Sequence, residues 1–388
     1  MRIFQLIFAA GLMLIGLSVQ AEVSEEEFNE LKAQYADLAE KVDGKSDISW
    51  ADRIAISGDF RFRYENIEEE GEHGRHRSRI RARTAIKASM PNVEIGIGLG
   101  TGGNDPVSSN VTLGEGGSSK DIRLDLAYAS WMGLSNTVVT LGKFKNPLIR
   151  VGGNGLLWDA DWRPEGMTAG WGNEHFFGTA IGSWLEGDSK KGSEYFWGLQ
   201  GGVKGELIGT SFTAGVSFFD MGTAGAKSAF GDVDDFFGNS FTCTDMVTPD
   251  DCTYNVNYEE IEVFAEAATK IAGQTVKFFA DFVRNQDAKE NDTGWALGIK
   301  VGKVKDLGQW AVGYLYQDLE ADAVLGLVTD SDFGGGGTDS RGHKISVAYG
   351  MNKSSALKAT YFINENNVAS GNPRDFDRLQ LDIQFKFK

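Results

Sequence analysis

From Ile54 to the end of the chain, apolar and polar residues alternate with a period of two. Residues 57–64 alternate aromatic with charged side chains, and residues 378–388 alternate apolar with polar ones. Because successive side chains of a β-strand point to opposite faces of its sheet, this pattern predicts strands with one apolar and one ionic face. About sixteen such segments begin near Ile54, Arg77, Val93, Ile122, Val138, Met167, Phe177, Glu194, Thr210, Glu260, Thr275, Gly294, Trp310, His343, Ala356 and Asp377.

The linkers between these segments alternate in length. Short linkers such as residues 90–92 and 272–273 are followed by long ones such as residues 102–120. This alternation is typical of a transmembrane antiparallel β-barrel, which has short periplasmic turns and long outer loops. The count of sixteen depends on a turn at residues 173–175, since a single strand over residues 167–185 would lower it.

Arginine occupies every second position from Arg75 to Arg83. A strand places all five guanidinium groups on one face. A lipid-facing Arg near the bilayer midplane costs about 2–4 kcal/mol, so five would cost on the order of 10 kcal/mol, comparable with a whole folding free energy of about 5–15 kcal/mol. The arginines must therefore face water. A soluble β-sandwich would also place them in water, with the apolar face as its core, but it has no reason for longer loops at one end only.

Sixteen strands close into a barrel wide enough for an aqueous channel. Closure brings the last strand beside the first, so the basic side chains of the first two strands and of the last strand are expected to form one pore-lining wall. Its members are Arg61, Arg63, Arg77, Arg79, Arg81, Arg83, Arg378 and Lys386. The alternative is a structural role, in which these arginines pair with carboxylates and stiffen the barrel.

The N-terminus has the pattern of an export signal. Arg2 precedes an apolar run, and residues 19–21 match a small-x-small cleavage site, which predicts a signal peptide over residues 1–21. A retained anchor is the alternative, although the run is shorter than the roughly 20 residues that span a bilayer. In residues 22–47, apolar positions at alternating spacings of 3 and 4 predict an acidic, periplasmic helical or coiled-coil segment; a solvated charged helix or loose linker is the alternative. The barrel is expected over residues 48–388.

Composition excludes several functions. With 55 acidic and 38 basic residues, the chain is not a general nucleic-acid binder. Cys243 and Cys252 are close in sequence, and export favours a local disulfide over two free thiols. The four histidines are scattered, so we expect no metal site and no cofactor. The chain also lacks HExxH, Walker and GxSxG motifs, so we do not expect an enzyme.

Four segments carry a family resemblance: SGDFRFRYENIEEE (57–70), RHRSRIRARTAIKA (75–88), SSKDIRLDLAYASW (118–131) and LGKFKNPLIRVGGNGLLWDADWRPEG (141–166). Together they resemble the Putative porin family of Gram-negative outer-membrane β-barrels. The resemblance implies an outer-membrane location and a channel.

In general porins the third outer loop folds inward and constricts the lumen, and here that loop is residues 146–164. It has apolar side chains to pack against the wall, glycines that let it bend, and the charged residues Arg150, Asp159, Asp161 and Arg163. An apolar outer loop used for trimer contacts or adhesion is the alternative.

The sequence therefore predicts an outer-membrane porin, a passive diffusion channel for small hydrophilic solutes. The net charge of −17 favours cations as the ions that the channel prefers, whereas the arginine wall favours anions. Screening over about 8 Å mutes the distant loop carboxylates, so we expect anion preference, with Asp159 and Asp161 forming a wall opposite the arginines. We expect a homotrimer in contact with membrane lipids and lipopolysaccharide. A structural or adhesion barrel with a plugged lumen is the alternative.

Overall fold

The computed structural model describes residues 50–187, 194–226, 236–244 and 252–388. The chain forms two units, residues 1–53 and 54–388. Of the first unit, only the short 3-10 helix η1 (Trp50–Arg53) is described, so the expected signal peptide and the expected helical segment over residues 22–47 lie outside the described residues. No helix in the described part of the chain has the length and apolarity to cross a membrane.

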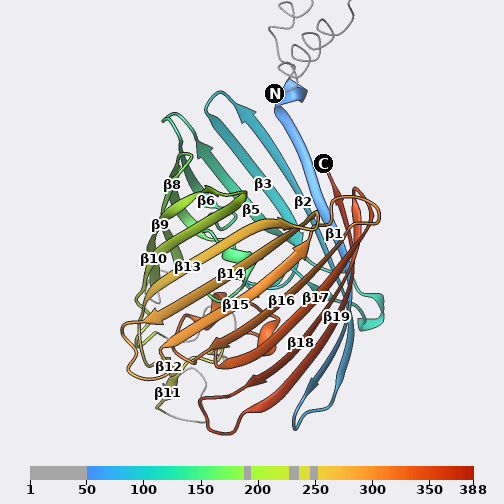
Figure 1. Cartoon of the computed structure of the whole chain (residues 1–388). Coiled ribbons are helices and arrows are strands. Elements are labelled where there is room, and N and C mark those ends of the chain that lie inside the picture. The colour runs from blue at the N-terminus through green and yellow to red at the C-terminus, as the bar shows by residue number, and fades with distance from the viewer. Residues whose placement is uncertain (1–49, 188–193, 227–235, 245–251) are drawn as a thin grey trace, which may run out of the picture. The chain divides into compact units, whose positions relative to one another are not determined.

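The second unit consists almost entirely of strands (Figure 1). They are β1 (Ile54–Glu69), β2 (Arg75–Met90), β3 (Val93–Thr101), β4 (Val111–Thr112), β5 (Ile122–Trp131), β6 (Thr137–Lys143), β7 (Glu165–Gly172), β8 (Phe176–Glu186), β9 (Glu194–Leu207), β10 (Thr210–Met221), β11 (Phe241–Cys243), β12 (Cys252–Tyr254), β13 (Tyr258–Ile271), β14 (Gln274–Asn285), β15 (Thr293–Gly302), β16 (Trp310–Leu319), β17 (Ser340–Asn352), β18 (Ser355–Asn366) and β19 (Arg374–Phe387). Four further 3-10 turns lie in loops: η2 (Glu115–Gly117), η3 (Val151–Gly153), η5 (Gly326–Val328) and η6 (Phe333–Gly335).

The main sheet is a closed antiparallel barrel. It has 17 strands, of which β4 is a two-residue addition to the edge of β2, so sixteen strands form the wall. β1 pairs with β2 along one edge and with β19 along the other, in register from Gly58 with Phe387 to Glu69 with Phe376. The expected all-β barrel of about sixteen strands is confirmed, and so is the turn at residues 173–175, which separates β7 from β8.

The two ends of the barrel differ. At one end the strands are joined by short turns, two of which contain only Ile208–Gly209 and Ala272–Gly273. Both residues of each turn have positive φ, from 48° to 78°, the conformation of a two-residue hairpin turn whose twist matches that of the strands, and glycine adopts it without strain. The other end has the long loops, including residues 102–121, 144–164 and 320–339.

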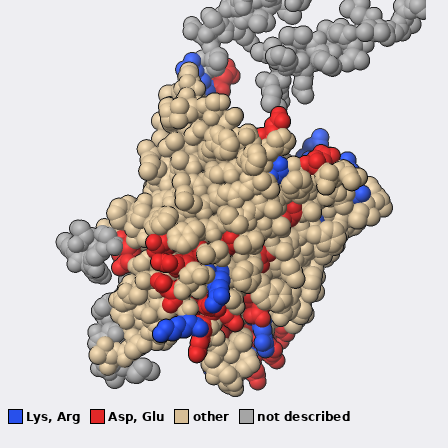
Figure 2. Space-filling view, turned by 60° about the vertical axis from the view of Figure 1, so that its left-hand side comes forward, with Lys and Arg blue, Asp and Glu red and all other residues tan. Residues whose placement is uncertain are grey.

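The barrel is apolar outside and ionic inside. Ile97 and Leu297 on the outer face are 54% and 51% exposed, whereas Arg63 and Glu65 on the inner face are 4% and 0% exposed. Figure 2 shows a broad outer surface almost without charged side chains, and below it a group of charged side chains of both signs, more of them acidic than basic. This distribution is the reverse of the one in a soluble β-sandwich, whose apolar side chains lie inside. An apolar outer surface of this extent requires lipid.

Three long loops fold into the barrel from one end. Loop 144–164 packs against strands β9 and β13 to β15 from inside, and loop 320–339 lies beside it. Their apolar side chains join inward-facing residues of β8 to β16 in one core, which includes Leu156, Trp158, Trp162, Phe196, Phe219, Phe264, Phe279, Leu325 and Val328. Loop 102–121 pairs with the edge of β2 through β4 and places Asn110 against Arg61 in the interior. The core of this barrel therefore fills one side of its interior.

The two cysteines form a disulfide in the loop between β10 and β13. Cys243 on β11 lies directly opposite Cys252 on β12, and their sulfur atoms are bonded. Both cysteines lie in or against the apolar core. The disulfide therefore fixes a loop hairpin and is far in sequence from the arginine wall.

Candidate functional site

The predicted basic wall lies on the inner faces of β1, β2 and β19. Its seven arginines are buried or half-buried there: Arg61, Arg63, Arg77, Arg79, Arg81, Arg83 and Arg378. Lys386 lies on the same face of β19 but at its exposed end, in register with Asp59. The expected wall therefore exists, and Lys386 is peripheral to it.

Glu65 is the common counterion of one half of this wall. Its Oε2 accepts a hydrogen bond from Arg77 Nε at 2.5 Å and lies 3.9 Å from Arg79. Its Oε1 accepts one from Arg378 at 2.7 Å and a longer one from Arg63 at 3.4 Å. One fully buried carboxylate thus faces four guanidinium groups from three adjacent strands.

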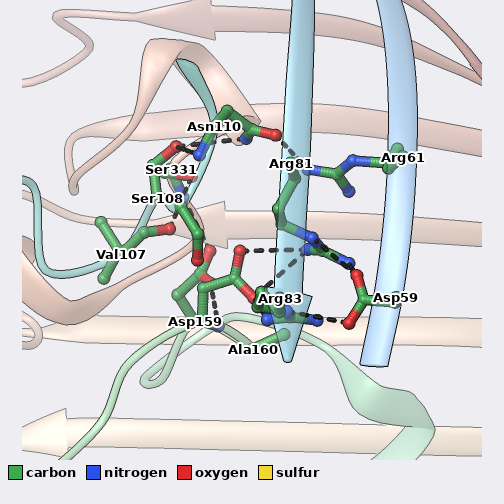
Figure 3. Close-up of polar contacts among 12 residues, drawn as sticks. Asp59, Arg61, Arg81, Arg83, Val107, Ser108, Asn110, Asp159, Ala160 and Ser331 are labelled. Atoms are coloured by element: carbon green, nitrogen blue, oxygen red, sulfur yellow. Dashed lines mark hydrogen bonds and ion pairs between the residues drawn. The ribbon is translucent and has the colours of Figure 1, made fainter. Parts of the chain in front are cut away.

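The second half of the wall is held by two aspartates (Figure 3). Asp59 on β1 accepts hydrogen bonds from Arg81 at 2.9 Å and Arg83 at 2.9 Å. Asp161 of loop 144–164 reaches the same pair, at 3.2 Å from Arg81 and 2.7 Å from Arg83. The sequence interpretation placed Asp161 on a wall opposite the arginines, across water. In the structure it is in direct contact with them, because opposite charges at this separation in a partly dry site attract strongly.

A second inward loop, which the sequence analysis did not single out, is also bound to the wall. Asp332 of loop 320–339 lies 3.0 Å from Arg63 and 2.9 Å from Arg378. Asp330 pairs with Lys344 on β17 at 2.7 Å. Burial opposes ionisation, but Arg378 and Arg63 hold the pKa of Asp332 well below its ordinary value. The sequence did contain a signal for this second inward loop. Residues 321–328 are largely apolar, and apolar side chains allow a loop to pack against the barrel wall, as argued above for loop 146–164.

Arg61 and Lys358 have no carboxylate within ion-pairing distance among the described residues, and Arg79 has only Glu65, at 3.9 Å. Arg61 donates to the Asn110 side chain at 2.5 Å, and Arg79 donates to the Asn110 carbonyl at 3.3 Å. Lys358 on β18 has no ion pair or hydrogen bond within the described chain. Arg63, by contrast, has a bidentate partner in Asp382 at 2.6 and 3.0 Å. The wall therefore carries more cationic groups than nearby carboxylates can neutralise.

The predicted charges of loop 146–164 have different roles. Arg150 donates to the backbone carbonyls of Asn154 and Trp158, at 3.4 and 2.8 Å. Arg163 donates to the Ala160 carbonyl at 2.9 Å and lies 3.4 Å from Asp125. Both arginines therefore brace the loop backbone.

Asp159 has no cationic partner within ion-pairing distance in the described chain. It accepts backbone N–H groups of Asp161 and Ser331, at 2.6 and 3.2 Å. Burial, together with the neighbouring Asp330 and Asp161, raises its pKa to about 8. Its carboxyl group is therefore held by backbone N–H groups and not by a cation in direct contact.

Three cavities lie along these groups. A cavity of about 990 Å³ at the loop end is bounded by Arg123, Asp161 and Arg163. A second of about 280 Å³ lies against Arg75, Arg77 and Arg378. A third of about 200 Å³ lies deeper, between the arginine wall and the tips of the two inward loops. Residues 107–110 lie between the cavities, joined to Ser331 on one side and to Arg61 and Arg79 on the other.

A lumen lined by charged side chains and narrowed by inward loops is the geometry of a channel. Comparison with known proteins identifies the family. The family described as "Putative porin" matches residues 67–229 and 234–387. The chain belongs to this family. It is a porin of the Gram-negative outer membrane, as the four segments quoted above predict. A search of curated protein sequences finds no match.

Solved porins share the fold at low sequence identity. Pseudomonas putida OprB, in a structure described as its high-pH form, is 10% identical, with a TM-score of 0.60 over 91% of this chain and 97% of that one. Salmonella typhi OmpF, solved in complex with daunomycin, is 12% identical, with a TM-score of 0.51 over 86% and 97%. Vibrio cholerae OmpT lacking loop L8 is 12% identical, with a TM-score of 0.50 over 86% and 99%. Family and fold are those of a channel rather than an enzyme.

Proposed function

We propose that this porin is a passive diffusion channel for small hydrophilic solutes, with a preference for anions. The observation that carries the proposal is the excess of cationic groups at the narrow part of the lumen, where Arg61 and Lys358 form no ion pair in the described chain and Arg79 has only a long one, to Glu65 at 3.9 Å. Groups that line the narrowest section act at short range. Acidic groups outside it are screened over about 8 Å at physiological salt.

Single-channel recording in planar bilayers tests the channel itself. The purified barrel should conduct chloride in steps of uniform size. The three inward loops, which fill much of the interior, are the specific observation that favours the alternative of a plugged structural or adhesion barrel. A folded barrel that never conducts would support that alternative.

Selectivity should depend on Arg61 and Lys358, which form no ion pair in the described part of the lumen. The double substitution Arg61→Gln and Lys358→Gln should move the zero-current potential in a salt gradient toward cations, because it removes two lumen charges without freeing a paired carboxylate. Arg284→Gln with Arg341→Gln is the matched control, since both side chains lie on outward-facing positions of β14 and β17 and the change in formal charge is the same. Equal shifts in both double variants would contradict a selectivity filter at the wall.

A homotrimer is proposed from strand length. β6 has 7 residues and β7 has 8, whereas β1 and β2 have 16 each. Seven residues rise about 23 Å along the strand and, with the usual tilt, about 18 Å along the membrane normal, less than an apolar band about 25 Å tall. A neighbouring barrel against this side would remove the mismatch with lipid. The remaining outer surface would contact lipid, and the loop end lipopolysaccharide.

Arginine on this side should therefore disrupt the oligomer. Leu141 and Met167 are opposite each other on β6 and β7 and point outward. Leu141→Arg with Met167→Arg should convert trimers to monomers in detergent, measured by mass photometry, because two like charges would be buried in the interface. Ile208→Arg, in an exposed turn, should leave the trimer intact. Trimers that persist in the double variant would place the interface elsewhere.

A further inference from the structure

The cavity of about 200 Å³ is lined by basic and acidic side chains that form no ion pair in the described chain. Arg61 on β1 and Lys358 on β18 line it from the barrel wall, and Asp159 lines it from loop 144–164. Its size is below the range of about 300–1,000 Å³ for pockets that hold drug-sized molecules. It therefore suits a solute of a few heavy atoms.

Arg61, Lys358 and Asp159 have no partner of opposite charge within ion-pairing distance in the described chain. Arg61 is only 9% exposed, and its Nε has no hydrogen-bond acceptor. Lys358 has no ion pair in the described chain, although it lies next to the buried wall, in register with Asp382. Asp159 is bonded only to backbone N–H groups. A buried charge without a partner is costly, so a ligand that brings the missing counter-charges would gain that energy.

We propose that this cavity binds a small zwitterion, with one carboxylate against Arg61 and Lys358 and one ammonium group against Asp159. An α-amino acid has this chemistry. The proposal rests on the proposed channel function and deepens it, because it names the solute class for which the lumen has a binding site. A simple anion would pair only with Arg61 and Lys358 on the wall, and a simple cation would pair only with Asp159 on the loop.

The surroundings of Asp159 predict that binding depends on pH. The acids Asp161 and Asp330 and the cations Arg150 and Lys344 are the charged groups that act on it. In the empty site, burial raises its pKa to about 8, so it carries a proton at lower pH. An ammonium group must displace this proton. The ratio of alanine affinity to propionate affinity should therefore fall from about pH 8.5 to about pH 6, because both probes share the carboxylate contacts and only alanine uses Asp159.

Three matched probes test the site: alanine, propionate, which lacks the ammonium group, and ethylammonium, which lacks the carboxylate. Alanine should reduce the chloride current of the full-length porin at concentrations about tenfold lower than either partial probe, since each lacks one charge-assisted contact. Asp159→Asn should weaken the alanine effect to that of propionate, and Lys358→Gln should weaken both. Glu365→Gln, an acid outside the lumen paired with Arg341, should change neither.

Calorimetry with the same three probes measures binding without conduction. If chloride flows but alanine binds no better than propionate at any pH, the zwitterion site is wrong and the channel proposal stands. If the barrel does not conduct yet binds alanine selectively, the channel proposal fails and the site stands. Because the comparison among probes uses the unmodified chain, it does not depend on whether a variant folds.

Discussion

Replacing Glu65 with alanine should lower the free energy of unfolding of the barrel by roughly 3–5 kcal/mol, the cost of removing one partner from a buried ion pair. Four arginines share this carboxylate, at 2.5 to 3.9 Å. Without it, the guanidinium groups of β1, β2 and β19 repel one another across the seam where the barrel closes. Urea unfolding in lipid vesicles measures the change.

Glu68→Ala is the matched control for this variant. Glu68 is on the same strand but exposed, so its loss should change stability by less than about 0.5 kcal/mol. A second measurement separates charge from packing: Glu65→Ala should shift the zero-current potential further toward anions, because the wall loses a negative charge. If neither stability nor potential changes, the arginines are solvated well enough to need no counterion, and Glu65 is not the centre of the wall.

The strands could be predicted from the sequence because lipid constrains every outward position. Each expected start lies within three residues of the observed one; His343, expected to begin a strand that starts at Ser340, is among the largest differences. The two-residue β4 and the β11–β12 hairpin were missed because two or three residues are too few to show a period. Where the alternation is sustained, as in β19, it located the strand and its two faces.

The pairing of charges in the lumen could not be predicted in the same way. Arg63 contacts Asp332 and Asp382, which are hundreds of residues away in sequence, and only barrel closure and loop folding bring them together. Periodicity identified the faces of β1 and β2, but it is weak in β14, where residues 278–279 and 282–283 are apolar on both faces. The inner face of β8 to β16 was therefore not recognised as the apolar surface that receives the loops.

Loop 144–164 should depend on one aromatic side chain for its position in the lumen. Trp158 is buried and stacks on Trp162 at 4.7 Å between ring centroids, with Phe219 at 5.0 Å and Phe196 at 5.4 Å. Truncating a buried Trp to Ala costs about 3–5 kcal/mol. Because every 1.4 kcal/mol is a factor of about ten in population, Trp158→Ala should make undocked states of the loop roughly a hundred to a few thousand times more frequent.

The barrel itself should survive this substitution, since the strand hydrogen bonds do not involve the loop. Single-channel records of Trp158→Ala should show a higher mean conductance and frequent transitions, while heat-modifiable migration on gels stays normal. Trp310→Ala, on the outer face of β16, removes the same side chain away from the lumen and should leave the records unchanged. Unaltered conductance in Trp158→Ala would mean that the polar anchors suffice, namely the Asn154 amide on Asp281 at 2.8 Å and the Asp161 ion pairs with the wall. In that case the charges, and not the apolar core, hold the constriction in place.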